Sequence, residues 1–126
     1  MVKYLSEVTK EQLINFQNNS PSPQLVIIKF EADWCRPCQQ IKELCNSLAS
    51  QLNDNIGYAI VNIDEHIELY ATLKTKKQVK GVPALLAFYA EKKDPNEWFL
   101  PNDSVIGADK NGIIQFFSRC NEYSSK

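Results

Sequence analysis

Two cysteines separated by two residues, Cys35 and Cys38, are the side chains of this sequence best suited to chemistry. Thiols at this spacing can exchange with a disulfide: one thiolate attacks to form a mixed disulfide, and the second cysteine releases it. Such a pair also occurs in zinc sites, but only one Cys-x-x-Cys is present and the other potential ligands lack metal spacing. The pair therefore predicts dithiol–disulfide exchange and not a zinc site.

The cysteine pair lies between a predicted buried strand and a predicted helix. Residues Gln24 to Glu31 are almost all apolar, as in a strand covered on both faces, except for Lys29. Apolar residues then recur at helical spacing from Cys38 to Leu52, and Pro37 is acceptable in the first turn. Cys35 would lie at the helix N-terminus, where unpaired N–H groups and the helix dipole lower a thiol pKa. We therefore expect Cys35 to be the attacking thiol.

The remaining chain alternates predicted helices and strands within one domain of 126 residues. Strands separated by helices favour α/β layers with at least two parallel strands. The Ser-Pro-Ser-Pro run at 20–23 ends the first helix. Helices are expected over Lys10–Asn18, over Ile67–Lys74 and after an N-cap at Asp109, and strands over Ile56–Ile63 and Ala84–Tyr89.

Residues Phe30 to Cys38, Phe-Glu-Ala-Asp-Trp-Cys-Arg-Pro-Cys, resemble the active-site strand and loop of the thioredoxin family. Val61–Asp64 is similar to the third strand of that family, Gly81–Pro83 to its cis-proline loop and Val105–Gly107 to the end of its last strand. The resemblance covers most of the chain. It implies an α/β thioredoxin fold with a central mixed β-sheet flanked by helices on both faces.

The resemblance also implies an activity, the reduction of disulfides in protein substrates without a bound cofactor. Trp34, Arg36 and Pro37 would shape the surface around the cysteines. Val82 and Pro83, joined by a cis peptide bond, would dock an extended substrate segment. Electrons would come from a thioredoxin reductase or another dithiol donor.

Two residues depart from the family pattern. Arg36 stands where most thioredoxins have glycine, and its charge should make the protein a slightly weaker reductant unless the side chain turns into solvent. Lys29 replaces a buried aspartate, and Ile60 replaces the lysine that usually partners that aspartate. Two interpretations of Lys29 stay open: it is buried near Cys38 and tunes the thiols, or its ammonium group reaches water.

A second function is consistent with these departures. The chain could be a binding or adaptor module whose dithiol is secondary or regulatory, as Lys29, Ile60 and an insertion at 91–104 suggest. The insertion contains Trp98-Phe99-Leu100. These residues either pack on the sheet as part of a longer hairpin or form an exposed apolar patch for a partner.

Composition and the remaining reactive residues restrict the possible partners, the location and any second reactive site. A formal net charge of −1 and a pI of about 5.8 provide no broad positive field for nucleic acid or an anionic membrane. No signal-peptide pattern opens the chain, and its apolar runs are far shorter than the roughly 20 residues that span a bilayer. We expect a soluble, cytoplasmic protein. Cys45 and Cys120 are expected in the core, and His66 in a solvated loop.

Overall fold

The central strand, β2 (Leu25–Glu31), is the apolar segment predicted before the cysteines. The computed structural model describes residues 1–19 and 22–125. In it, β2 pairs in parallel with β3 (Ile56–Asn62) and antiparallel with β4 (Ala84–Tyr89). β1 (Lys3–Leu5) and β5 (Asp103–Ile106) complete a mixed sheet of order β1-β3-β2-β4-β5. The predicted mixed sheet is confirmed, and β1 is an additional edge strand too short to show a hydrophobic period.

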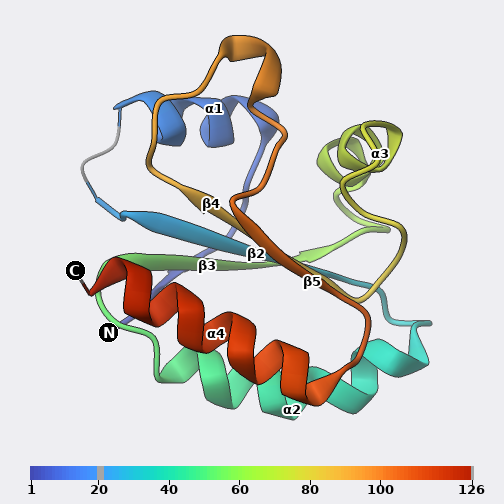
Figure 1. Cartoon of the computed structure of the whole chain (residues 1–126). Coiled ribbons are helices and arrows are strands. Elements are labelled where there is room, and N and C mark those ends of the chain that lie inside the picture. Colours follow the sequence, from blue (N-terminus) through green and yellow to red (C-terminus); the bar gives the residue numbers. More distant parts are fainter. Residues whose placement is uncertain (20–21, 126) are drawn as a thin grey trace.

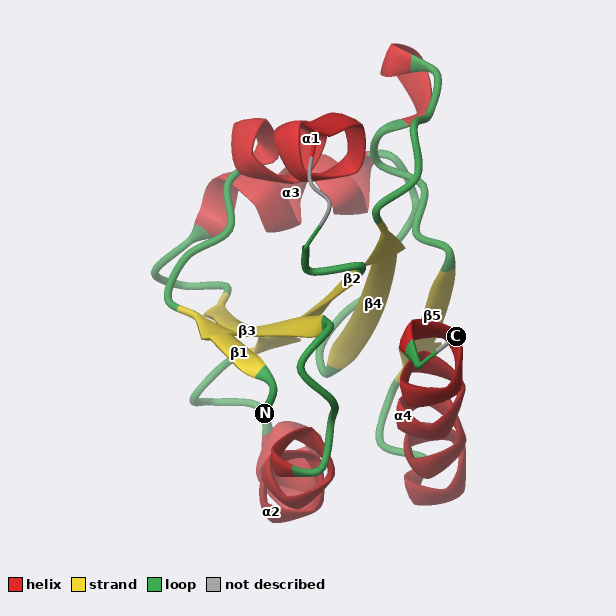
Figure 2. Cartoon of the chain, turned by 90° about the vertical axis from the view of Figure 1, so that its left-hand side faces the viewer, coloured by secondary structure: helices red, strands yellow, loops and turns green. Residues whose placement is uncertain are grey.

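Helices cover both faces of this sheet, as expected (Figure 1). On one face lie α1 (Lys10–Asn19) and α3 (Ile67–Thr75), and on the other α2 (Arg36–Ser50) and α4 (Lys110–Ser124) (Figure 2). All four predicted helices are therefore present, although α2 begins and ends two residues earlier than its apolar pattern indicated. Ser20 and Pro21 of the predicted helix break lie outside the described residues.

Side chains of β2 enter two separate cores because they alternate between the faces of the sheet. Val26, Ile28 and Phe30 join the cluster beneath α1 and α3. Leu25 and Ile27 join the cluster beneath α2 and α4. This double burial explains the nearly continuous apolar sequence of the strand. It also places residue 29 on the face covered by α2.

The insertion at 91–104 forms a long connection between β4 and β5 that includes the short 3₁₀ helix η1 (Pro95–Glu97). Trp98 is only 7% exposed and packs in the cluster beneath α1. Gln17 Nε2 donates a hydrogen bond to the Trp98 carbonyl oxygen at 2.9 Å, and Lys10 Nζ lies 5.3 Å from the indole centroid. Trp98 therefore packs as part of the fold, whereas Leu100 is 37% exposed.

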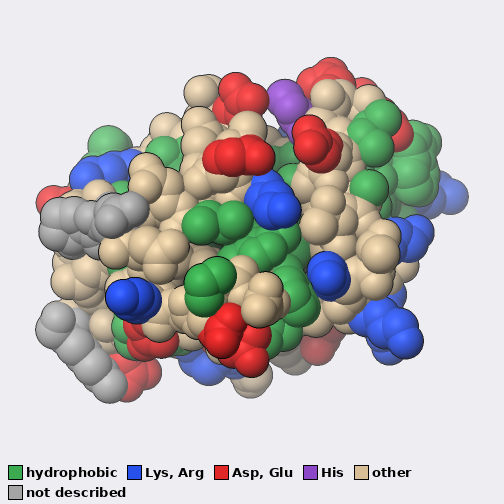
Figure 3. All heavy atoms as spheres, turned by 90° about the horizontal axis from the view of Figure 1, so that it is seen from above, with side chains coloured by type: hydrophobic (Ala, Val, Ile, Leu, Met, Phe, Trp, Pro, Cys, Tyr) green, Lys and Arg blue, Asp and Glu red, His purple; other side chains and the backbone are tan. Residues whose placement is uncertain are grey.

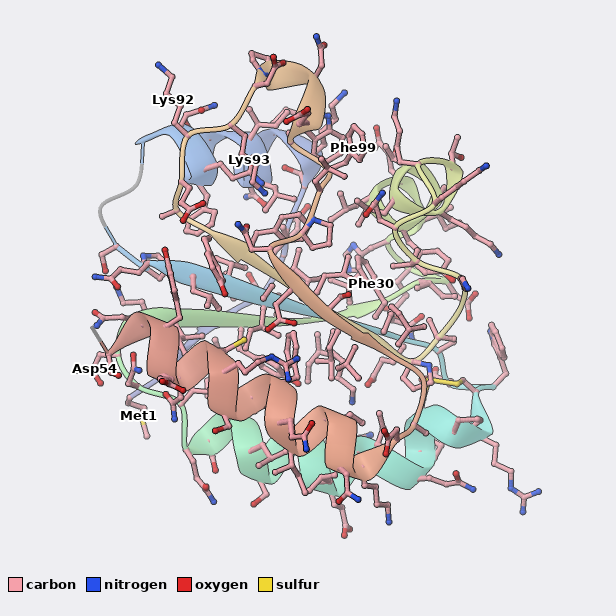
Figure 4. The ribbon with its side chains drawn as sticks, viewed as in Figure 1. Met1, Phe30, Asp54, Lys92, Lys93 and Phe99 are labelled. Atoms are coloured by element: carbon pink, nitrogen blue, oxygen red, sulfur yellow. A yellow bond between two sulfur atoms is a disulfide. The ribbon has the colours of Figure 1, made fainter. Side chains whose placement is uncertain are left out.

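The turn before β3 ties the end of α4 to the rest of the molecule. Asn53 Nδ2 donates a hydrogen bond to Ser124 Oγ at 2.8 Å, and Asn55 Nδ2 donates one to the Ser124 carbonyl oxygen at 2.9 Å. The ammonium group of Met1 pairs with Asp54 in the same turn. Both ends of the chain consequently meet at one end of the sheet, where Figure 4 labels Met1 and Asp54.

Tyr58→Phe should leave the free energy of unfolding unchanged or raise it by up to about 1 kcal/mol, because a buried hydroxyl without a partner opposes folding. Tyr58 is 1% exposed, and its hydroxyl has no hydrogen-bond partner in the described part of the chain. Urea unfolding of both proteins at neutral pH measures the difference. A loss of more than about 1 kcal/mol would mean that the hydroxyl is satisfied by an ordered water.

Candidate active site

Cys35 is the N-cap residue of α2, the position where a side chain can accept a hydrogen bond from the first turn of the helix. Its Sγ accepts the Cys38 backbone N–H at 3.2 Å, and Pro37 occupies the first turn. Cys35 and Cys38 form a disulfide, with their Cα atoms 5.2 Å apart, on the right of Figure 4. Once the disulfide is reduced, the same N–H group favours a thiolate at Cys35 over a neutral thiol.

The loop before β4 lies directly against the cysteine pair. The Val82–Pro83 peptide bond is cis, as the family resemblance implied. The Val82 carbonyl oxygen is 3.5 Å from Cys35 Sγ, and Val82 and Ile63 pack against the cysteines. The Pro83 carbonyl oxygen accepts the Gly107 N–H at 2.9 Å, which joins this loop to the end of β5. Gly107 has φ of 94°, a conformation that favours glycine.

Trp34 lies on the surface beside the cysteines and is held there by an aspartate that follows the strand β3. The residue is 68% exposed, and its indole Nε1 donates a hydrogen bond to Asp64 Oδ2 at 2.9 Å. Asp64 follows β3, the parallel neighbour of β2, so both strands end at the same edge of the sheet. Sequence reasoning did not identify Asp64 as a site residue, although its place at the end of this strand is a usable signal.

Lys29 is completely buried, which contradicts the interpretation that its ammonium group reaches water. Its Nζ lies 2.8 Å from Glu31 Oε1, and the Glu31 side chain is 20% exposed. The contact is an ion pair without hydrogen-bond alignment, since Nζ has no hydrogen-bond partner among the described residues. Residues 29 and 31 share one face of β2, so strand alternation was the available signal for Glu31. Ile60, opposite Lys29 on β3, is 42% exposed.

Comparison with known proteins agrees with this geometry. The family model "Thioredoxin" matches residues 6–119. The chain belongs to the thioredoxin family. It is 33% identical to "Thioredoxin 3" of Plasmodium falciparum over 94 residues, covering 75% of this chain and 47% of that protein. It is also 33% identical to "Thioredoxin Y2, chloroplastic" of Arabidopsis thaliana over 96 residues, covering 75% of this chain and 54% of that protein. The chain thus spans about half the length of these two relatives.

A solved thioredoxin structure shows how far the similarity in fold extends. The structure of Trichomonas vaginalis thioredoxin superposes with a TM-score of 0.60 at 26% identity, covering 94% of this chain and 96% of that chain. The chain therefore has the thioredoxin fold over most of its length.

The two other cysteines of this thioredoxin-family chain are structural. Cys45 and Cys120 are 0% exposed, as expected. Burial raises the pKa of Cys45, with smaller opposing effects from Lys29 and Glu31, so this ion pair lies close enough to α2 to act on a thiol there. Burial raises the pKa of Cys120 to about 12. Both remain thiols at neutral pH, and thiols are poor nucleophiles.

Other site types have little support in the described chain. His66 is exposed at the N-terminal end of α3, in agreement with the predicted solvated loop. Across residues 1–19 and 22–125, no three His, Cys, Asp or Glu side chains gather in a way that could hold a metal ion. None of the helices described in this thioredoxin-family chain has the length and apolar character needed to cross a membrane.

Proposed function

We propose that the protein reduces disulfides in protein substrates, with Cys35 as nucleophile and Cys38 as resolving thiol. The placement of Cys35 Sγ carries this proposal: the sulfur accepts the Cys38 N–H at 3.2 Å and lies 3.5 Å from the Val82 carbonyl oxygen. A helix N-terminus that donates to the sulfur favours the thiolate. The adjoining loop supplies backbone groups for an extended substrate segment.

The reaction exchanges one disulfide for another. The Cys35 thiolate attacks one sulfur of the substrate, the substrate S–S bond breaks, and the leaving sulfur takes up a proton. The Cys38 thiol then loses its proton and attacks Cys35 Sγ, which releases the second substrate sulfur as a thiol. The substrate gains two electrons and two protons, and the protein retains the Cys35–Cys38 disulfide. A thioredoxin reductase or another dithiol donor in the cytoplasm would restore the reduced state, and the protein needs no bound cofactor.

Reduction of insulin disulfides by dithiothreitol, with and without the protein, tests this proposal. Turnover well above the rate of dithiothreitol alone supports the reductase function, provided that the increase depends on Cys35. Near-background activity with both cysteines intact would instead support the adaptor function, in which the dithiol is secondary or regulatory.

Arg36→Gly should lower the reduction potential by about 5–20 mV, since an exposed charge beside a thiolate contributes about 0.3–1 kcal/mol. Arg36 is exposed at the start of α2, next to Cys35. Its positive charge favours the reduced, thiolate-bearing form, so its removal makes the protein a stronger reductant. Equilibration with a glutathione redox buffer measures the potential. Arg36→Lys keeps the charge and should keep the potential, whereas equal potentials in all three proteins would mean that Arg36 only contacts solvent.

A further inference from the structure

The segment joining α3 to the Val82–Pro83 loop is strongly basic although the whole chain has a net charge of −1. Four lysines lie within its seven residues, and all are exposed. None forms an ion pair with a carboxylate among the described residues, where the ion pairs are Met1–Asp54, Lys29–Glu31 and Arg119–Asp103. We call residues 74–80 the basic segment; its lysines are Lys74, Lys76, Lys77 and Lys80.

The basic segment leads directly into the active site. Lys80 precedes Val82 by two residues, and the Val82 carbonyl oxygen is 3.5 Å from Cys35 Sγ. Arg36, also exposed, follows Cys35 at the start of α2. Figure 3 shows lysine and arginine side chains along the right-hand side of the molecule, over and beside α3. A substrate disulfide that reaches Cys35 is therefore approached by cations from two elements of the chain.

Internal contacts hold the basic segment in place. The Lys77 N–H donates to the Lys74 carbonyl oxygen at 3.0 Å, and the Gln78 N–H donates to the Leu73 carbonyl oxygen at 2.9 Å. Lys76 Nζ lies 5.1 Å from the centroid of the Phe99 ring, a cation–π contact with the insertion at 91–104. The insertion thus supports the basic segment, and ordering the segment before binding reduces the entropy lost when a partner docks.

Two aspartates beside the site each accept a hydrogen bond from a neighbouring neutral side chain. Asp64 accepts the Trp34 indole N–H at 2.9 Å, and Asp33 accepts the Asn62 side-chain amide at 3.4 Å. Neither aspartate is in an ion pair within the described chain, so the site carries negative charge beside Trp34 and positive charge on the basic segment and Arg36. Four lysines within seven residues suit a short acidic peptide segment, because nucleic acid or a membrane would require a broader positive field than this chain provides.

We propose that the basic segment and Arg36 select protein substrates whose disulfide is flanked by aspartate or glutamate residues. This inference rests on the proposed reductase function and names its substrate class. Carboxylates next to the substrate disulfide would contact the exposed ammonium groups while the extended peptide pairs with Val82. These contacts are solvent-exposed, so they raise the rate of productive encounter and weaken as salt is added.

Three disulfide substrates test the inference. Two are peptides that differ only in having glutamate or lysine beside the cysteines, and the third is the uncharged 2-hydroxyethyl disulfide. Lys77→Glu/Lys80→Glu should lower kcat/KM for the glutamate peptide by about 2- to 30-fold, as expected for the loss of two exposed charge pairs. The same variant should raise kcat/KM for the lysine peptide and leave 2-hydroxyethyl disulfide unaffected. The changes should diminish in high salt.

Lys77→Glu alone should also lower kcat/KM for the glutamate peptide, and Lys92→Glu is the matched control for this single change. Lys92 is exposed and lies, in Figure 4, at the opposite side of the molecule from the disulfide. Reversing the charge of residue 92 should therefore not alter the preference for the glutamate peptide over the lysine peptide. Equal reduction of both peptides by the unaltered protein, or a preference that survives Lys77→Glu/Lys80→Glu, would overturn this inference while the reductase function stands. Failure to reduce any of the three disulfides would overturn the reductase function and this inference with it.

Discussion

Cys35→Ser should reduce disulfide turnover to the rate of dithiothreitol alone, whereas Cys38→Ser should stop turnover after the first chemical step. Cys35 caps α2 and its sulfur accepts the Cys38 N–H, so the attacking thiolate is stabilised at residue 35. Without Cys38 no second thiol can attack the mixed disulfide. The Cys38→Ser protein should therefore accumulate covalently bound substrate, and the Cys35→Ser protein should not.

Mass spectrometry after acid quenching detects the covalent adduct, and alkylation of the reduced protein at neutral pH identifies the more reactive thiol. Cys35 should react first. Cys45 and Cys120 should stay unlabelled in the folded protein, because burial raises the pKa of both thiols. Cys120→Ala removes a thiol remote from the site and should leave turnover unchanged. Faster labelling of Cys38, or an adduct on the Cys35→Ser protein, would show that the two roles are reversed.

Glu31→Met should lower the free energy of unfolding by about 3–5 kcal/mol, the usual cost of removing one partner from a buried ion pair. Lys29 is 0% exposed, so its ammonium group would lose its counter-ion with no route to water. Lys29→Met should be less costly, because the Glu31 side chain is already 20% exposed and can be hydrated. Lys29→Met/Glu31→Met should be close to the unaltered protein, since apolar side chains of similar volume often replace a buried pair at little cost.

Urea unfolding of the four proteins forms a double-mutant cycle that isolates the interaction between the two residues. Additive losses would mean that Lys29 and Glu31 do not stabilise each other.

The same proteins test whether the pair acts on the thiols. Lys29→Met leaves Glu31 unbalanced, so it should raise the pKa of Cys35 and lower the reduction potential by roughly 10–30 mV. The double variant should restore both values. If the Cys35 pKa and the reduction potential are unchanged in the Lys29→Met protein, the role of Lys29 is structural only.

The dithiol site could be predicted from the sequence because its determinants are local. Cys35, Pro37 and Cys38 belong to one strand-to-helix turn, and the cap geometry follows from the start of α2. The Val82–Pro83 loop is distant in sequence, and only the resemblance to a family connected it with Cys35. Spacing alone does not encode that contact, since it depends on the antiparallel pairing of β2 with β4.

Other features depend on packing that composition does not reveal. The apolar character of Trp98 was compatible with a core position and with an exposed patch, and the contacts with α1 decide for the core. The burial of Lys29 was similarly open, since the ammonium group of a lysine in an apolar strand either reaches water or is buried beside a counter-charge. Glu31 supplies that charge from the same strand face, where alternation would have placed it.

The turn at residues 53–55 has a consequence for how this domain can be joined to others. Met1 pairs with Asp54, and Ser124 near the end of α4 is hydrogen-bonded by Asn53 and Asn55, so Met1 and the end of α4 lie at one pole of the sheet. The disulfide lies at the opposite pole (Figure 4). A tag, a surface linker or a fusion partner attached at either end would leave the dithiol facing outward. Immobilisation through the termini should thus preserve access for large substrates.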